Sequence, residues 1–371
     1  MPDLAACEQE PVDLRLHTAN DGVVSKNIVI CLDGTGNQMR AKGDTNVVRL
    51  YSMLALDAPS SQVAYYDPGV GTFSAQGALT PIAKRFTKLF GLAFGTGLRT
   101  NIGEAYLFLM RHWEPGDRIF LFGFSRGAYA ARAFSGMLAT VGVLQRGSEN
   151  LIPYAIEVYS RSKNYGSQDW RRLHEFANVF SQQVDGKQAV PIRFVGLWDS
   201  VKAAGVLRWN LRWPFTRKLR TAETVRHAVS IHEKRRPYRQ YLVTPLALGQ
   251  HLEEVWFGGV HSDVGGTFDD DSRLSTIALA WMMDGALGAG LLVDPDKLAK
   301  ECSMSPDDAL GEVHRMGWVW AFLTYRKRRV PRGAKVHSSM RARWEADHSF
   351  APNVPDDAVW VDPDWAKDRR D

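Results

Sequence analysis

Uninterrupted apolar runs, rather than alternating ones, mark the strands that this sequence predicts. The runs lie at residues 27–32, 62–66, 119–122, 190–198 and 253–260. A strand buried on both faces has no solvent side with which to alternate, so such runs are typical of a parallel sheet covered by helices. The segments with a helical pattern are 46–54, 101–113, 128–140, 150–186, 222–232 and 274–283. This succession of strands and helices predicts an α/β fold with a mostly parallel central sheet flanked by helices.

One domain accounts for most of the chain, because the sequence shows no internal repeat and no low-complexity linker. We expect a flexible N-terminal arm over residues 1–25, a single domain over 26–355 and a C-terminal tail over 356–371, because Pro352, Pro355 and Pro363 favour extended structure. Two insertions interrupt the pattern, at about 72–97 and 202–222. We expect them to form a cap or lid over the sheet.

The segment from Asp117 to Arg132 carries the clearest chemical signal. A buried strand leads into Gly-Phe-Ser-Arg-Gly at 123–127, and a helix rich in small residues follows. A sharp strand-to-helix turn strains its serine and requires small neighbours, which predicts Ser125 as a nucleophile. The backbone N–H of Arg126, at the positive end of the helix, would face a developing oxyanion. The alternative is a tight turn whose serine only caps the helix.

Asp199 and His261 also stand directly after buried strands. An α/β-hydrolase fold presents its catalytic groups at the carboxyl ends of strands in the order serine, acid, histidine. We therefore expect His261 to move the proton of Ser125 and Asp199 to orient the imidazole. Asp263 could replace Asp199 or cap the next helix. The other histidines considered as the base are His227, expected to be buried on a helix, and His232, His251 and His337.

The loop at 33–37 follows the first strand and has the sequence Asp-Gly-Thr-Gly-Asn. It could supply the second oxyanion N–H from Gly34 or Thr35. It also resembles the Asp-x-Asp-x-Thr loop of phosphatases, but Cys31 occupies the position of their nucleophile. Met39 stands where a dinucleotide-binding loop has its third glycine. We therefore expect no cofactor.

Basic and aromatic residues outside these motifs bear on the substrate. The segment 81–92 has an apolar and a basic face, the latter with Lys84, Arg85 and Lys88, and predicts a surface helix or a lid that contacts membranes. A second group suggests an acyl pocket bordered by positive charge, although core packing would also explain its aromatic members. This group comprises Arg208, Trp209, Arg212, Trp213 and Phe215.

Composition narrows the setting. With 46 basic and 41 acidic residues among 371, the net charge of +5 permits peripheral contact with an anionic membrane, and we expect no nucleic-acid partner. Cys7, Cys31 and Cys302 have no zinc-site spacing and favour a reducing compartment. No signal peptide or long apolar run is visible, so we expect a cytoplasmic location, without excluding signal-independent export. The run at 269–271 lacks the spacing of a calcium loop, so we expect a solvated helix start and no metal ion.

Four motifs in order resemble one family. They are Cys-Leu-Asp-Gly-Thr-Gly-Asn at 31–37 with Thr-Asn-Val at 45–47, Gly-Phe-Ser-Arg-Gly-Ala at 123–128, Gly-Leu-Trp-Asp-Ser-Val at 196–201, and Trp-Phe-Gly-Gly-Val-His-Ser-Asp-Val-Gly-Gly at 256–266. From about Lys26 to about Pro355 the chain resembles the α/β-hydrolase family of uncharacterised proteins that includes the catalytic domains of type VI secretion phospholipase effectors. The resemblance implies Ser125 as nucleophile, Asp199 as acid, His261 as base, and cleavage of phospholipid acyl esters. Relatives usually carry an acidic residue at the position of His232.

The sequence therefore predicts an α/β-hydrolase-like serine hydrolase that cleaves carboxylic esters, including lipid acyl esters of the phospholipase A type, through an acyl-enzyme. Two alternatives stay open. One is a non-catalytic binding module on the same fold, against which the intact trio of residues counts. The other is a thioesterase or amidase, because acyl transfer to water uses the same groups. The oligomeric state stays open.

Overall fold

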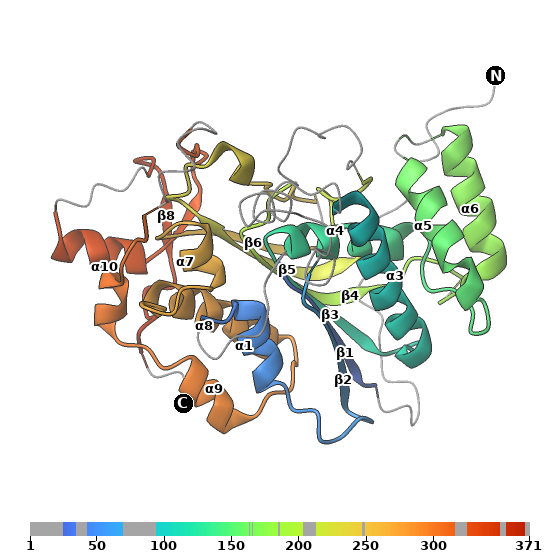
Figure 1. Ribbon diagram of the computed structural model, residues 1–371, viewed down its shortest axis with the longest axis horizontal. Helices are drawn as coiled ribbons and strands as arrows, with labels where there is room; N and C mark the ends of the chain where they lie inside the picture. The colour runs from blue at the N-terminus through green and yellow to red at the C-terminus, as the bar shows by residue number, and fades with distance from the viewer. Residues whose placement is uncertain are drawn as a thin grey trace, which may run out of the picture.

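Eight parallel strands form one sheet in the described part of the computed structural model, in the order β2-β1-β3-β4-β5-β6-β7-β8 (Figure 1). The structure describes residues 25–34, 43–69, 94–162, 164, 166–184, 186–202, 213–246, 249–315, 325–348 and 354–367. The strands are β1 (Asn27–Leu32), β2 (Gln62–Asp67), β3 (Arg118–Phe124), β4 (Ile192–Trp198), β5 (Ala222–Ser230), β6 (His251–Phe257), β7 (Lys335–His337) and β8 (Val359–Val361).

Helices cover both faces of this sheet (Figure 1). The α-helices are α1 (Asn46–Met53), α3 (Phe94–His112), α4 (Arg126–Thr140), α5 (Ile152–Arg161), α6 (Gln168–Phe180), α7 (His261–Gly265), α8 (Arg273–Gly288), α9 (Pro295–Glu301) and α10 (Ser339–Ala346). Short 3₁₀ helices lie at η1 (Glu149–Leu151), η2 (Arg236–Tyr238) and η3 (Pro306–Leu310). No helix among the described residues is long and apolar enough to span a membrane.

Alternate residues of the central strands enter two different cores. In β1, Ile28 and Ile30 pack with residues of α3, α4, α5 and α6, whereas Val29 and Cys31 pack with residues of α1 and α8. Both sets are buried, which is why the apolar run in β1 shows no alternation. The predicted parallel α/β sheet is confirmed.

The direction of strand addition reverses at β1. The strand β2 lies on one side of it, while β3 and all later strands lie on the other. In doubly wound folds, ligands bind outside the carboxyl ends of the strands at this kind of reversal. Here these ends are followed by Asp33, after β1, and by Ser125, after β3.

The predicted helix at 222–232 is wrong, because this segment forms β5 between β4 and β6. The three-residue spacing of Ala222, Val225 and Ala228 imitates a helix. The polar residues between them have partners that only the tertiary structure supplies: His227 Nδ1 lies 2.8 Å from Glu254 Oε2, for example. Tertiary context therefore overrides the local pattern.

The C-terminal residues also differ from the expected extended tail. Strand β7 pairs with β6, and β8, within 356–371, pairs with β7. Trp365 beyond it is buried in the core that α1 and α8 share. In the first predicted insertion, at about 72–97, helix α3 begins at Phe94. The predicted N-terminal arm up to residue 24 and the amphipathic stretch at 81–92 lie outside the described residues.

Candidate active site

Ser125 occupies the turn between β3 and α4 in a left-handed conformation, with φ 59° and ψ −118°. Such a conformation costs a residue other than glycine about 1–3 kcal/mol, so the surroundings must impose it. A Cβ atom on Gly127 would lie 2.1 Å from the carbonyl oxygen of Leu32, and one on Gly123 would lie 2.7 Å from the carbonyl oxygen of Gly127. Both glycines are therefore required by close backbone contact around the serine.

The three residues predicted as catalytic form one hydrogen-bonded chain. His261 Nε2 lies 2.8 Å from Ser125 Oγ, and His261 Nδ1 lies 2.5 Å from Asp199 Oδ2. Asp199 follows β4 and His261 begins α7, just after β6. Residues distant in sequence meet here because parallel strands place their carboxyl ends along one edge. All three side chains are buried.

Aromatic rings hold the His261 imidazole on two sides. The ring of Phe124 stacks on it at 4.7 Å between centroids, and the ring of Tyr238 meets it edge-on at 4.9 Å. A Cβ atom on Gly265 would lie 1.9 Å from the Phe124 ring, so glycine there makes room for the stack. Burial lowers the pKa of His261, although its hydrogen bond to Asp199 opposes the shift. The imidazole is therefore neutral and able to accept a proton near pH 7.

Asp199 is fixed by donors on both carboxylate oxygens. Its Oδ1 accepts the backbone N–H of Ser230 at 3.0 Å and a bond from Arg328, whose other terminal nitrogen donates to Oδ2 at 2.9 Å. Burial alone would raise the pKa of this carboxyl, but Arg328 and His261 hold it well below its usual range. Sequence reasoning missed Arg328, because it stands in a run of basic residues at 326–329 with no pattern to distinguish it.

A second buried carboxylate supports the histidine. Glu233 accepts the backbone N–H of His261 at 3.2 Å and binds the guanidinium of Arg235 at 2.6 and 2.9 Å. The sequence directed attention to its neighbour His232, whose Nδ1 instead accepts the backbone N–H of Gly259 at 2.8 Å. Glu233 gave no signal of its own, since charged residues surround it in the sequence.

The oxyanion donors predicted from the sequence are the backbone N–H groups of Arg126 and of Gly34 or Thr35. Arg126 is the first residue of α4, and its N–H lies at the positive end of that helix. The N–H of Gly34 donates to Asp33 Oδ1 at 2.5 Å, so using it for an oxyanion requires that hydrogen bond to break. Thr35 lies outside the described residues. The contribution of Gly34 and Thr35 stays a prediction.

The other candidates for base or acid have structural partners. Asp263 accepts the backbone N–H of Val260 at 2.7 Å, and so caps α7. Buried His227 accepts the backbone N–H of Ser200 at 3.1 Å through Nε2. The histidines that remain lie elsewhere: His337 stacks on Phe257, and His251 is exposed.

Trp213 and Phe215, two aromatic members of the expected acyl pocket, pack against other aromatic rings. The Trp213 indole is buried in the core beside the Tyr159 ring, at 5.5 Å between centroids, and Phe215 lies against Trp170 at the same distance. Packing accounts for both aromatic residues. Arg208, Trp209 and Arg212, the other members of that group, lie outside the described residues.

One group in the described part of the chain has the composition of a metal site. Ligand atoms of Asp270, Glu312 and His314 lie within 4.8 Å of one another. Both ring nitrogens of His314 face carboxylates, Nδ1 at 2.5 Å from Asp263 and Nε2 at 3.1 Å from Asp270. These carboxylates raise the pKa of His314 against the opposing effect of burial, so a protonated imidazole already satisfies them. Asp271 instead binds the Arg273 guanidinium at 2.6 Å at the start of α8.

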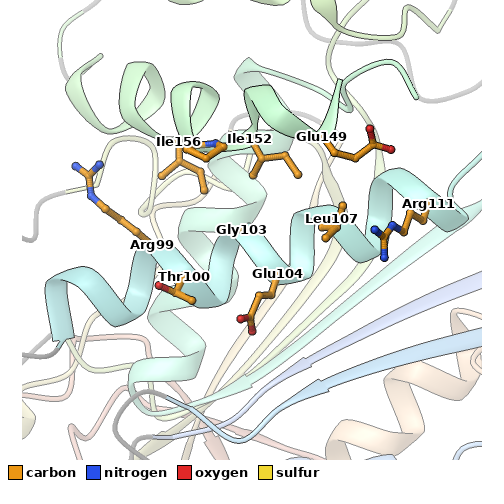
Figure 2. Close-up of a pocket in the computed structure, with 10 residues that line it drawn as sticks. Arg99, Thr100, Gly103, Glu104, Leu107, Arg111, Glu149, Ile152 and Ile156 are labelled. Atoms are coloured by element: carbon orange, nitrogen blue, oxygen red, sulfur yellow. The ribbon is translucent and has the colours of Figure 1, made fainter. Parts of the chain in front are cut away.

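A cavity of about 450 Å³ lies between α3 and α5 (Figure 2). Its apolar wall includes Leu107, Ile152 and Ile156, and charged side chains such as Arg99 and Arg111 stand at its ends. Ser125, Asp199 and His261 do not line it. We therefore place the candidate chemistry at the carboxyl edge of the sheet and not in this cavity.

Comparisons with known proteins show what this chain is similar to. The chain is 36% identical to the uncharacterised protein YEL023C of Saccharomyces cerevisiae over 241 residues, which cover 63% of this chain and 35% of that protein. A crystal structure of an uncharacterised protein from Pseudomonas aeruginosa matches with 20% identity and a TM-score of 0.44, over 77% of this chain and 50% of the other. The Tle1 effector bound to the VgrG spike from the type 6 secretion system matches with 21% identity and a TM-score of 0.36, over 66% and 52%.

The chain thus spans between about a third and a half of the length of these relatives. A sequence model of the type VI secretion phospholipase effector Tle1-like catalytic domain matches residues 26–285. That match covers well over half of the chain and includes Ser125, Asp199 and His261. The protein belongs to the family of Tle1-like phospholipase effector catalytic domains.

Proposed function

We propose that this protein is a serine hydrolase that cleaves carboxylic esters of lipids through an acyl-enzyme. The observation that carries the proposal is the hydrogen-bonded chain Ser125–His261–Asp199, with its serine in a strained turn at the start of a helix. Membership of a phospholipase family supports lipid acyl esters as the substrate class. Two hydrogen bonds support the first proton transfer, one between Ser125 and His261 and one between His261 and Asp199.

In the acylation step, His261 Nε2 accepts the proton of Ser125 as Oγ attacks the ester carbonyl carbon. The resulting oxyanion receives the N–H of Arg126 and a second donor, which we assign to the loop carrying Gly34 and Thr35. Asp199 stabilises the imidazolium through Nδ1. His261 then returns the proton to the departing alcohol, and the acyl group stays on Ser125.

In the deacylation step, water replaces the alcohol and the same groups act again. His261 takes a proton from the water as its oxygen attacks the acyl carbon. The tetrahedral intermediate collapses, Ser125 leaves with the proton from His261, and the free acid departs. No electron transfer is involved, so the cycle closes with ester and water converted to acid and alcohol.

Covalent labelling tests the proposal directly. We expect a fluorophosphonate probe to label the wild-type protein, and Ser125→Ala or His261→Ala to abolish labelling while thermal unfolding stays near the wild-type value. The exposed Arg329→Ala variant is the matched control and should label normally. A folded wild-type protein that resists the probe would contradict the proposal and favour a binding module. Esters, thioesters and amides of one acyl chain, compared next, then identify the bond cleaved.

A further inference from the structure

Arg328 is a buried cation that makes direct contact with the proposed catalytic acid. It lies beyond residues 26–285, the part of the chain that the family model matches. Taking two opposite charges out of water is costly, and the cost is recovered only when geometry is good and the remaining hydrogen-bond positions are filled. The contacts of Arg328 supply acceptors for both terminal nitrogens of its guanidinium.

Four donors fill the acceptor positions of the Asp199 carboxylate, and two of them come from Arg328. An ionised carboxylate has about four acceptor positions. On Asp199, Arg328 takes one on each oxygen, the N–H of Ser230 takes the third, and His261 Nδ1 takes the fourth. Three fixed donors thus leave one position, and the imidazole occupies it. A planar fork of this kind fixes the orientation of a carboxylate in a way that a single point charge does not.

The same guanidinium reaches the wall of the site. Its two terminal nitrogens also donate to the backbone carbonyls of Ser230, at 2.7 Å, and Tyr238. The Tyr238 ring stands edge-on to His261, at 4.9 Å between centroids. Arg328 therefore connects the end of β5, the acid and a wall of the imidazole pocket through one rigid group.

Two more charged groups face the same imidazole. Glu233 accepts the backbone N–H of His261, and Arg235, paired with Glu233, lies over the Tyr238 ring at 3.9 Å from its centroid. These charges of opposite sign neutralise each other beside the ring. The positive charge of Arg328 lies on the Asp199 carboxylate, and it offsets part of the electrostatic attraction between that carboxylate and a protonated His261.

We propose that Arg328 is a positioning residue of this hydrolase, which holds Asp199 in the plane where one acceptor position faces His261 and limits how strongly Asp199 stabilises the imidazolium. This inference rests on the proposed function. It gives Arg328 two separable effects, one through its shape and one through its charge. The fork fixes the geometry on which the rate depends, and the charge sets the pH at which His261 loses its proton.

Two substitutions separate these effects. Arg328→Gln removes the charge and keeps an amide donor, whereas Arg328→Lys keeps the charge and removes the fork. The measurement is the second-order rate constant of fluorophosphonate labelling between pH 4.5 and 9, with Arg329→Ala as the exposed neighbouring control. For Arg328→Gln we expect the acidic limb to move to higher pH by about 0.5–1 unit, since a cation no longer opposes imidazolium formation. For Arg328→Lys we expect the limb to stay in place and the plateau rate to fall about 10- to 100-fold.

The outcomes that overturn the inference are specific. A folded Arg328→Gln variant with the wild-type limb and plateau would remove both effects. If that variant does not fold, an Arg328→Lys variant with the wild-type plateau would show that the fork is unnecessary. Equal losses in the Arg329→Ala control would also refute a role of Arg328 itself. A wild-type protein that the probe never labels refutes the proposed function, and this inference falls with it, which distinguishes the two failures.

Discussion

Two opposing effects act on the pKa of the His261 imidazole. Burial among Phe124, Tyr238 and the backbone disfavours its charged form, while Asp199 favours that form at 2.5 Å. Burial is the larger influence, so the pKa of His261 is lowered from its ordinary value. A histidine that must accept a proton benefits from this, because the neutral form is already present when substrate arrives.

The consequence is a rate that persists into mildly acidic solution. In the proposed mechanism only neutral His261 accepts the Ser125 proton, so a lowered pKa moves the midpoint of the acidic limb below about pH 6.5, the ordinary histidine value. We therefore expect the labelling rate constant at pH 6.5 to be more than half of its value at pH 7.5, and to fall further at lower pH. Quenched time courses of fluorophosphonate labelling between pH 4.5 and 9 measure the midpoint. A midpoint above 6.5 would mean that Asp199 outweighs burial.

The three residues that the structure brings together are those at which backbone geometry leaves a mark in the sequence. Ser125 stands between glycines that close contacts require, and Asp199 and His261 follow buried strands, so position alone selected all three as candidates. Arg328 and Glu233 left no such mark. Each is an ordinary charged residue in a charged stretch, and its burial depends on segments that meet only after the sheet has formed.

At the scale of elements, the strands with continuous apolar runs were predictable and the others were not. Strand β5 interleaves its apolar residues with Arg226, His227 and other polar ones, which have partners on neighbouring elements such as Asp284 and Glu254. Strands β7 and β8 are three residues long, too short for any periodic pattern to show. Their pairing depends on the edge that β6 offers.

Those two strands lead to a prediction about the end of the chain. We expect deletion of residues 356–371 to destabilise the protein by at least about 3–5 kcal/mol, because it removes β8 and the buried Trp365 side chain. Deletion of residues 368–371 is the control, since it leaves every described residue in place. Thermal and denaturant unfolding compare the two. Equal unfolding free energies would show that these residues act as the tail expected from the sequence.

At the scale of the whole molecule, the net charge of +5 bears on how a lipid substrate would be reached. We expect the protein to bind vesicles that contain phosphatidylserine and not vesicles of phosphatidylcholine alone, with binding that weakens as salt is added. Reversal of two charges in the basic stretch, by Lys84→Glu with Lys88→Glu, should weaken vesicle flotation about tenfold or more. Reversal of two charges at the exposed Lys297 and Lys300 of α9 is the control. Equal losses would point to overall charge and not to that stretch.

The order of elements along the chain also has a consequence in time. Ser125, Asp199 and His261 leave the ribosome before Arg328, and the strands that extend the sheet past β6 come later still. At synthesis rates of about 5–20 residues per second, the nascent chain carries the proposed nucleophile, base and acid for several seconds before Arg328 is added. If Arg328 positions Asp199 as inferred, the growing chain stays a poor hydrolase until Arg328 has been added and has folded against Asp199. The timing of activity during synthesis would then follow from the order of residues within one chain.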